Sequence, residues 1–197
     1  MGSLTEEQQS IILGSLLGDG YMACKTHAYL KIGHSIKQKD YVDWKYNILS
    51  PLVKSQPKSY LGNGTRVGYR FWTKSLPALT PYYKMFYGRN GQKQIPDNLV
   101  LTPLALSIWY MDDGARNRAS SYFNTQSFTI QDQKKLLQIL DAQFGLKGNL
   151  NKDKTYFRIR LFQKDAQRMK SMIKPLIPDF MYYKLPFRPR IDSELGT

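Results

Sequence analysis

The chain has 197 residues, of which 42% are hydrophobic and 13% aromatic. This length and composition suit one compact domain, or two small halves that share a core, and exclude a large multidomain assembly and a disordered chain. The single cysteine, Cys24, excludes disulfide frameworks and zinc sites built from several cysteines, and it favours a reducing compartment.

Charge is the most informative part of the composition. The chain carries 29 Lys and Arg against 15 Asp and Glu, which gives a formal net charge of +14 at pH 7. Residues 1–98 and 99–197 share this excess equally, so it is not a basic tail. The expected partner is therefore a polyanion such as nucleic acid.

No membrane or targeting segment is predicted. The uncharged run over residues 99–111 contains a proline and is too short to span a bilayer, and the first residues lack the pattern of a signal peptide. We therefore expect a soluble intracellular protein, located in the cytoplasm of a prokaryote or in an organelle such as a mitochondrion or chloroplast.

The first half of the chain predicts the order helix, hairpin, helix, hairpin, helix. Thr5 caps a first helix that ends at Gly18-Asp19-Gly20, and both glycines of the turn at 62–65 are expected to take positive φ. The elements that follow are strands at 21–24 and 29–34, a helix at 39–49, strands at 58–61 and 66–72, a helix at 75–87 and a connector at 88–94.

The second half predicts the same order again. Its first helix ends at Gly114, just as the helix of the first half ends at an Asp-Gly pair. The predicted elements are a helix at 101–113, a strand at 121–128, a helix at 132–144, strands at 146–151 and 155–162, and a helix at 166–173.

Repeat-related landmarks fix the register of this duplication. Asp19 and Asp113 lie 94 residues apart, and Lys93 and Lys184, each near a proline, lie 91 apart. Segments 33–36 and 125–128 also fall at equivalent places, each just before an amphipathic helix. We expect a pseudo-twofold monomer with halves at 1–98 and 99–197, a symmetry that matches duplex DNA.

The strongest local signal is a pair of nonamers, ILGSLLGDG at 12–20 and LSIWYMDDG at 106–114. If the two helices pack along the dyad, Asp19 and Asp113 meet at one end of the pair. Two acids at the negative ends of helices repel each other unless a divalent cation or a positive group lies between them. An ordinary turn at the helix end would explain one Asp-Gly, but two at repeat-related positions favour a site.

The same nonamers predict how the helices pack. Gly14 and Gly18 lie on one strip of the first helix, where another backbone can approach closely. Ile108 or Trp109 of the second helix is expected to fill the space that the glycines leave. The alternative is that the two helices sit slightly apart.

Both nonamers resemble the motif of the LAGLIDADG homing endonucleases, in the branch that carries two motifs in one chain. The segments at 101–103, 124–129, 173–178 and 183–186 look especially like the yeast mitochondrial intron-encoded subgroup. The resemblance covers residues 7–187. It implies an α+β fold of two pseudo-symmetric αββαββα halves, with the motif helices at the interface and saddle-shaped antiparallel β-sheets over the DNA.

The resemblance also implies the roles of the polar residues. Asp19 and Asp113, at the eighth motif position, would ligate Mg²⁺, with Mn²⁺ as a possible substitute, while Asp112 departs from the small residue that is usual at position seven. Two hard carboxylates suit such an ion, which lowers the pKa of an attacking water. Lys93 and Lys184 would stabilise the transition state, and Gln126 and His34 are candidates for hydrogen bonds to active-site water.

Polar residues on the strands are the candidates for DNA contact. They alternate with residues expected to be buried, although any half-buried sheet shows this alternation, so only their charge points to DNA. The candidates are Lys31, Arg66, Arg70, Arg116, Arg118, Asn124, Arg158 and Arg160.

The predicted function is site-specific double-strand DNA cleavage of a long asymmetric target, leaving 3′ extensions and promoting mobility of an intron or intein. The first alternative is an RNA maturase that binds intron RNA and assists splicing, with or without nuclease activity. The others are a catalytically silent DNA-binding module, and a different metal nuclease that uses Asp97 with Asp132 and Lys134.

Overall fold

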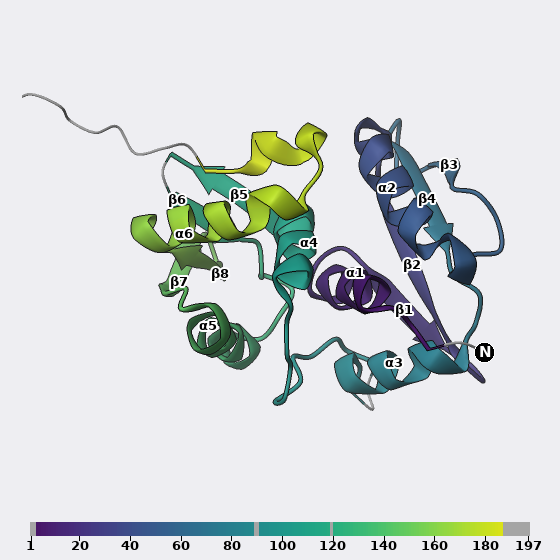
Figure 1. Cartoon of the computed structure of the whole chain (residues 1–197), viewed down its shortest axis with the longest axis horizontal. Helices are drawn as coiled ribbons and strands as arrows, with labels where there is room; N and C mark the ends of the chain where they lie inside the picture. Colours follow the sequence, from purple (N-terminus) through teal and green to yellow (C-terminus); the bar gives the residue numbers. More distant parts are fainter. Residues whose placement is uncertain (1–2, 89–90, 119, 187–197) are drawn as a thin grey trace, which may run out of the picture.

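The computed structural model describes residues 3–88, 91–118 and 120–186 (Figure 1). Its elements follow the order αββαββα twice, as the sequence predicts. The first set is α1 (Glu6–Leu17), β1 (Tyr21–Cys24), β2 (Ala28–Ser35), α2 (Lys39–Leu49), β3 (Lys58–Leu61), β4 (Val67–Trp72) and α3 (Thr80–Phe86). The second set is α4 (Pro103–Asp113), β5 (Gly114–Asn117), β6 (Ser120–Phe123), α5 (Ile130–Phe144), β7 (Gly148–Asp153), β8 (Tyr156–Leu161) and α6 (Gln163–Ile173).

The strands form two separate antiparallel sheets with matching topology. Their orders are β1-β2-β4-β3 and β5-β6-β8-β7, so each sheet has a hairpin at each edge. Figure 1 shows the two sheets on opposite sides of the central helices α1 and α4. The α+β class and the doubled architecture are therefore confirmed.

The central helices α1 and α4 pack so closely that only glycine fits at two positions of α1. A Cβ atom on Gly14 would lie 2.5 Å from the Ile108 Cβ and from the Ala105 carbonyl oxygen. A Cβ on Gly18 would lie 2.4 Å from the Cβ of Asp112. The close approach and the role of Ile108 are confirmed, and the alternative of separated helices is wrong.

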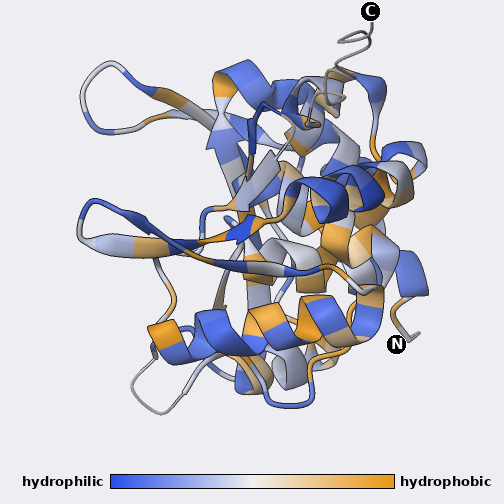
Figure 2. Cartoon of the chain, turned by 90° about the vertical axis from the view of Figure 1, so that its left-hand side faces the viewer, coloured by the Kyte–Doolittle hydropathy of each residue, from blue (hydrophilic) through white to orange (hydrophobic). Residues whose placement is uncertain are grey.

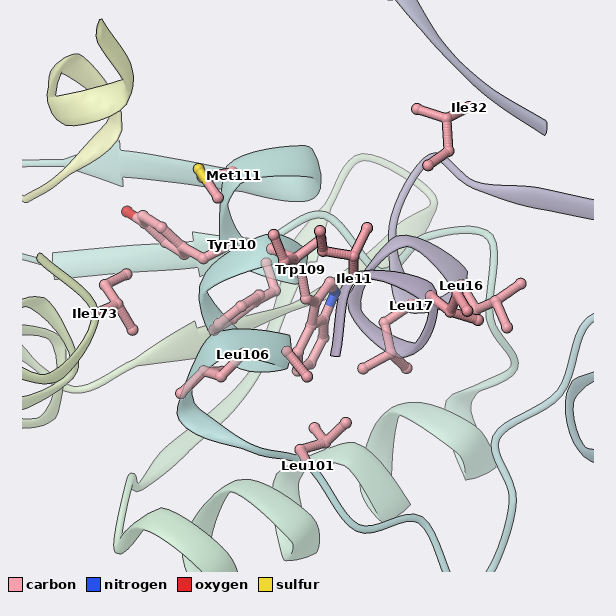
Figure 3. Close-up of a cluster of buried hydrophobic side chains, with 14 of the residues drawn as sticks. Ile11, Leu16, Leu17, Ile32, Leu101, Leu106, Trp109, Tyr110, Met111 and Ile173 are labelled. Atoms are coloured by element: carbon pink, nitrogen blue, oxygen red, sulfur yellow. The ribbon is translucent and has the colours of Figure 1, made fainter. Parts of the chain in front are cut away.

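The hydrophobic core extends continuously from the helix seam into both halves. The indole of Trp109, which is fully buried, lies between α4 and α1 (Figure 3). Ile11 and Leu17 lie beside it on α1. Because this packing holds the ends of α1 and α4 together, it fixes the side chains that follow each helix.

Several predicted details differ from the structure. The strand predicted at 121–128 ends at Phe123, because a turn at 125–128 leads to Thr129, which caps α5. The helix predicted at 75–87 is shortened by its prolines to a 3₁₀ turn and α3. The helix predicted from residue 101 begins at Pro103, after its cap Thr102. Gly64 adopts φ of 67°, but Gly62 does not adopt positive φ.

The capping of α1 follows the prediction. The Thr5 hydroxyl accepts from the Gln8 backbone N–H, and the Gln8 side chain accepts from the Thr5 N–H, each at 3.2 Å. Within the described ranges, none of the helices is both long and apolar enough to span a bilayer.

Candidate active site and nucleic-acid interface

The two predicted acids lie together where α1 and α4 end. The Asp19 backbone N–H donates to Asp112 Oδ2 at 3.3 Å, so the chain after α1 touches the last turn of α4. The Asp19 side chain is 49% exposed, and that of Asp113 is partly buried. The structure therefore places both carboxylates at one end of the seam, within reach of solvent.

Their environments move their pKa values in opposite directions. A hydrogen bond with His34 is the main reason that the pKa of Asp19 is below its ordinary value. Burial, reinforced by repulsion from Asp19 and Asp112, raises the pKa of Asp113 to about 7. This repulsion is what a bound cation would relieve.

Lys93 and Lys184 occupy equivalent places at the ends of the two motif helices. Lys93 Nζ donates to the carbonyl oxygens of Gly18 at 3.2 Å and Gly20 at 2.8 Å. Lys184 Nζ donates to the Asp112 carbonyl at 2.9 Å and to that of Met111. Each ammonium thus neutralises the negative end of one helix beside an acid. Burial lowers the pKa of both lysines.

His34 lies beside Asp19, whereas Gln126 contacts a residue of β7. His34 Nδ1 is 3.3 Å from Asp19 Oδ2, while Gln126 Nε2 donates to Asp153 Oδ2 of β7 at 3.4 Å. Tyr21 pairs with Lys31 in the first sheet, and Ala115 pairs with Tyr122 in the second. Because Tyr21 and Ala115 each lie two residues after the motif aspartate, Lys31 corresponds to Tyr122. His34 and Thr125 lie three residues further along and are therefore counterparts. The expected equivalence of the two segments is therefore wrong by one residue. A role for Gln126 toward water stays a prediction.

A buried polar network surrounds Asp112, and it was not predicted from the sequence. Asp112 Oδ1 accepts from Lys45 Nζ and from the Tyr41 hydroxyl, each at 2.7 Å. Lys45 also donates to the Ser15 hydroxyl at 3.1 Å, and both side chains of the ion pair are completely buried. The available signals were a lysine four residues after Tyr41 on α2, and an acid where the first motif has Gly18.

The side chains that face away from the helices make the candidate DNA surface of the first sheet. Register places Lys31 opposite Trp72, and Arg70 lies one pair further along on the same face. The Arg70 guanidinium lies 3.8 Å from the ring centre of Tyr60 and 4.6 Å from that of Trp72. These aromatic contacts hold the guanidinium in place on the open face.

A similar arrangement lies on the second sheet. The guanidinium of Arg158 is 4.2 Å from the Tyr122 ring centre, and that of Arg160 is 5.9 Å from it. Arg158 Nη1 also donates to Asn124 Oδ1 at 3.4 Å. Sequence alternation indicates the face, but it does not reveal the aromatic rings that hold these cations.

The other three candidates lie at or near hairpin tips. Arg66 precedes β4 and Arg118 follows β5, with φ of 52°, and both are exposed. Arg116 pairs with Ser121, whose buried side chain points to the face of the sheet that the helices cover. Paired residues point to the same face, so the expectation that Arg116 shares the open face is wrong. Figure 2 shows hairpins with hydrophilic tips projecting from one side of the molecule.

Asp19 and Asp113 can supply some, but not all, of the ligands of a hard divalent cation. Carboxylate oxygens are the ligands that such ions prefer. Among the described residues, no group of three or more Asp, Glu, His or Cys side chains is arranged to hold a metal. Asp19 and Asp113 would therefore need further oxygens from water or from a phosphate.

The alternative nuclease site is not supported. Asp97 forms an ion pair with Lys135, and the buried Asp132 accepts from the Ile95 N–H at 3.2 Å and interacts with the capping residue Thr129. Both acids thus have structural partners, at places other than the dyad.

The raised pKa of Asp113 predicts a pH-dependent stability. The folded, metal-free protein holds this proton more tightly than the unfolded chain, whose pKa is near 3.8, so stability falls as pH rises from there through about 7. In EDTA, Asp113→Asn should be more stable than the parent by roughly 2–4 kcal/mol at about pH 8. Urea denaturation should show this difference disappearing below about pH 4, and a pH-independent difference would contradict it.

Arg70 should contribute to nucleic-acid binding mainly through its charge. Arg70→Ala should weaken DNA binding and reduce the slope of log K against log salt by about 1. Fluorescence anisotropy over a salt series measures this slope. Arg168→Ala, which removes an exposed arginine on α6, is the control. An unchanged slope for Arg70→Ala would show that this face does not contact phosphate.

Comparisons with known proteins agree with this geometry. A model of the LAGLIDADG DNA endonuclease family matches residues 9–169. The DNA endonuclease I-ChuI of Chlamydomonas applanata is 32% identical over 93% of this chain and 96% of its own. The homing endonuclease I-WcaI, solved bound to its DNA recognition sequence, has a TM-score of 0.86 and 25% identity over 95% of this chain and 89% of its own.

Two further similarities concern the fold and a protein that acts on RNA. I-DmoI, solved in complex with DNA and Ca, has a TM-score of 0.50 and 12% identity over 89% of this chain and 91% of its own, which supports the fold alone. The cytochrome b mRNA maturase bI2 of Saccharomyces cerevisiae is 28% identical over 94% of this chain, which spans about half of that protein (48%).

Proposed function

Because the chain belongs to the LAGLIDADG DNA endonuclease family, we propose that it is a site-specific endonuclease that cuts both strands of a long, asymmetric DNA duplex. The observation that carries this proposal is that Asp19 and Asp113 lie at the adjoining ends of α1 and α4, close enough to repel each other, with a lysine at each helix end. One carboxylate would serve each scissile phosphate. The cleavage would leave 3′ extensions and promote mobility of an intron or intein.

In the proposed mechanism Asp19 and Asp113 would hold divalent metal, with Mg²⁺ as the proposed ion and Mn²⁺ as a substitute. When bound, the metal would lower the pKa of an attacking water and neutralise charge on the phosphate. Lys93 and Lys184 add positive charge beside the acids without leaving the helix carbonyls. The open faces of the two sheets bind the duplex on either side of the dyad. Arg70 and Arg158, whose guanidinium groups pack against aromatic rings, make contacts to it.

Maturase activity is the second candidate, favoured by the similarity to a cytochrome b mRNA maturase over 94% of this chain. A splicing assay with the intron that surrounds the coding sequence tests it directly. A gain in splicing rate on addition of protein, independent of Asp19 and Asp113, would support a maturase. No gain would leave DNA cleavage as the supported activity.

The test of the endonuclease proposal uses the uninterrupted form of the gene in which the coding sequence lies. A plasmid carrying the joined flanks should be linearised in Mg²⁺ at one position near the junction, and end mapping should show 3′ extensions. The same plasmid with the insertion should stay intact, and EDTA should stop the reaction. Failure to cut in Mg²⁺ or Mn²⁺, or cleavage unaffected by EDTA, would overturn the proposal.

A further inference from the structure

The two candidate acids are supported differently, despite the repeat. Asp19 contacts His34 through its carboxylate and Asp112 through its backbone N–H. Within the ranges that the structure describes, no side chain lies within hydrogen-bond or ion-pair distance of the Asp113 carboxylate. The asymmetry therefore concerns the groups that would bind metal and phosphate.

The support on the Asp19 side comes from residues of both halves. Asp112, from α4, extends over Gly18, because only glycine leaves room for it there. Its carboxylate is fixed by the buried Lys45 and Tyr41 of α2. The repeat-related position in the other direction is Gly18 itself, which has no side chain to reach back toward Asp113.

His34 stands between the two carboxylates. Its side chain is only 3% exposed, with Nδ1 at 3.3 Å from Asp19 Oδ2 and Nε2 at 3.6 Å from Asp112 Oδ1, the latter beyond hydrogen-bond length. The ring also packs against Tyr41, with centres 5.1 Å apart. Thr125, the counterpart of His34, instead donates to Gln133 at 3.0 Å, so this position provides no equivalent group for Asp113.

We propose that His34 is a positioning residue for Asp19 alone, held in place by Tyr41 and Asp112, and that the two strands are consequently cut through inequivalent sites. This inference rests on the proposed endonuclease function and deepens it. A carboxylate oriented by a buried ring presents a fixed oxygen to the metal, whereas Asp113 has to be ordered by the metal and the phosphate themselves. Loss of His34 should then slow only one strand.

The test measures the two strand-cleavage rates separately, with the full chain, Mg²⁺ and the insertion-free duplex labelled on each strand. Asp19→Asn and Asp113→Asn first show which strand depends on which acid. His34→Ala should slow the Asp19-dependent strand by about 10- to 100-fold and leave the other within about twofold. His34→Asn, whose amide nitrogen can occupy the place of Nδ1, should restore most of the rate.

The outcomes separate the inference from the function it rests on. Equal slowing of both strands by His34→Ala, or no slowing of either, would overturn the positioning role. Cleavage of both strands by Asp19→Asn and Asp113→Asn would overturn the roles given to the two acids, and failure of the parent chain to cut either strand in Mg²⁺ or Mn²⁺ would overturn the proposed function instead. If His34→Ala does not fold, Tyr41→Phe, which removes one donor to Asp112, should slow the same strand, and equal rates for both strands in that variant would reject the inference.

Discussion

Asp19→Asn and Asp113→Asn should each abolish double-strand cleavage while leaving DNA binding measurable. An amide is a weaker ligand than a carboxylate for a hard cation and carries no charge, so the transition state loses several kcal/mol, which is about a 10³-fold fall in rate. Each variant should retain nicking of the strand that the other acid serves. Gel analysis of supercoiled, nicked and linear plasmid over time measures the rates of nicking and of double-strand cleavage.

The matched control for this pair is Asp141→Asn. It makes the same chemical change on an exposed position of α5, away from the seam, and should leave cleavage unchanged. DNA affinity in both test variants should equal or exceed that of the parent, because removal of a negative charge reduces repulsion from phosphate. Full double-strand cleavage by either variant would refute the assignment of the acids.

Lys45→Met should destabilise the fold strongly. It removes the ammonium that lies 2.7 Å from Asp112 Oδ1 in a site that excludes solvent, and so leaves a buried carboxylate without its cation. Breaking a buried pair in this way costs roughly 3–5 kcal/mol. Urea denaturation of the free protein near pH 7 should show this loss as a lower midpoint with an unchanged slope.

Two companion variants show whether the cause is the unpaired charge. Lys45→Met combined with Asp112→Leu replaces both ions with apolar groups and should recover most of the lost stability. Lys39→Met breaks the exposed ion pair with Asp43 on the same helix, where solvent screens the charges, and should leave the urea midpoint almost unchanged. Equal losses for Lys39→Met and Lys45→Met would contradict the account of the buried pair.

The sequence contains enough to predict the doubled fold. Local signals, such as the cap at Thr5 and the Asp-Gly ends of two apolar helices, are short-range and repeat at a fixed interval, so element order and helix packing follow from them. Gly14 and Gly18 even indicate the seam, because a strip without side chains has few uses other than close packing. Ends of elements were less predictable where prolines or a turn residue intervene, as at 124–128.

The candidate site was predictable only in part. Asp19, Asp113, Lys93 and Lys184 stand at repeat-related positions, and the repeat together with the family resemblance indicates them. The link from Lys45 to Asp112 joins residues 67 apart in the chain and has no counterpart in the repeat. A lysine on an amphipathic helix normally faces solvent, so its burial becomes visible only when α2 is packed against the helix seam.

Finding manganese in crystals of the protein with its cleaved or uncut DNA would test the central claim most directly. Anomalous scattering should place Mn²⁺ in contact with carboxylate oxygens of both Asp19 and Asp113, between the ends of α1 and α4 and against the scissile phosphates. Metal bound to other side chains of a DNA-cutting complex, with both aspartates out of contact, would contradict it.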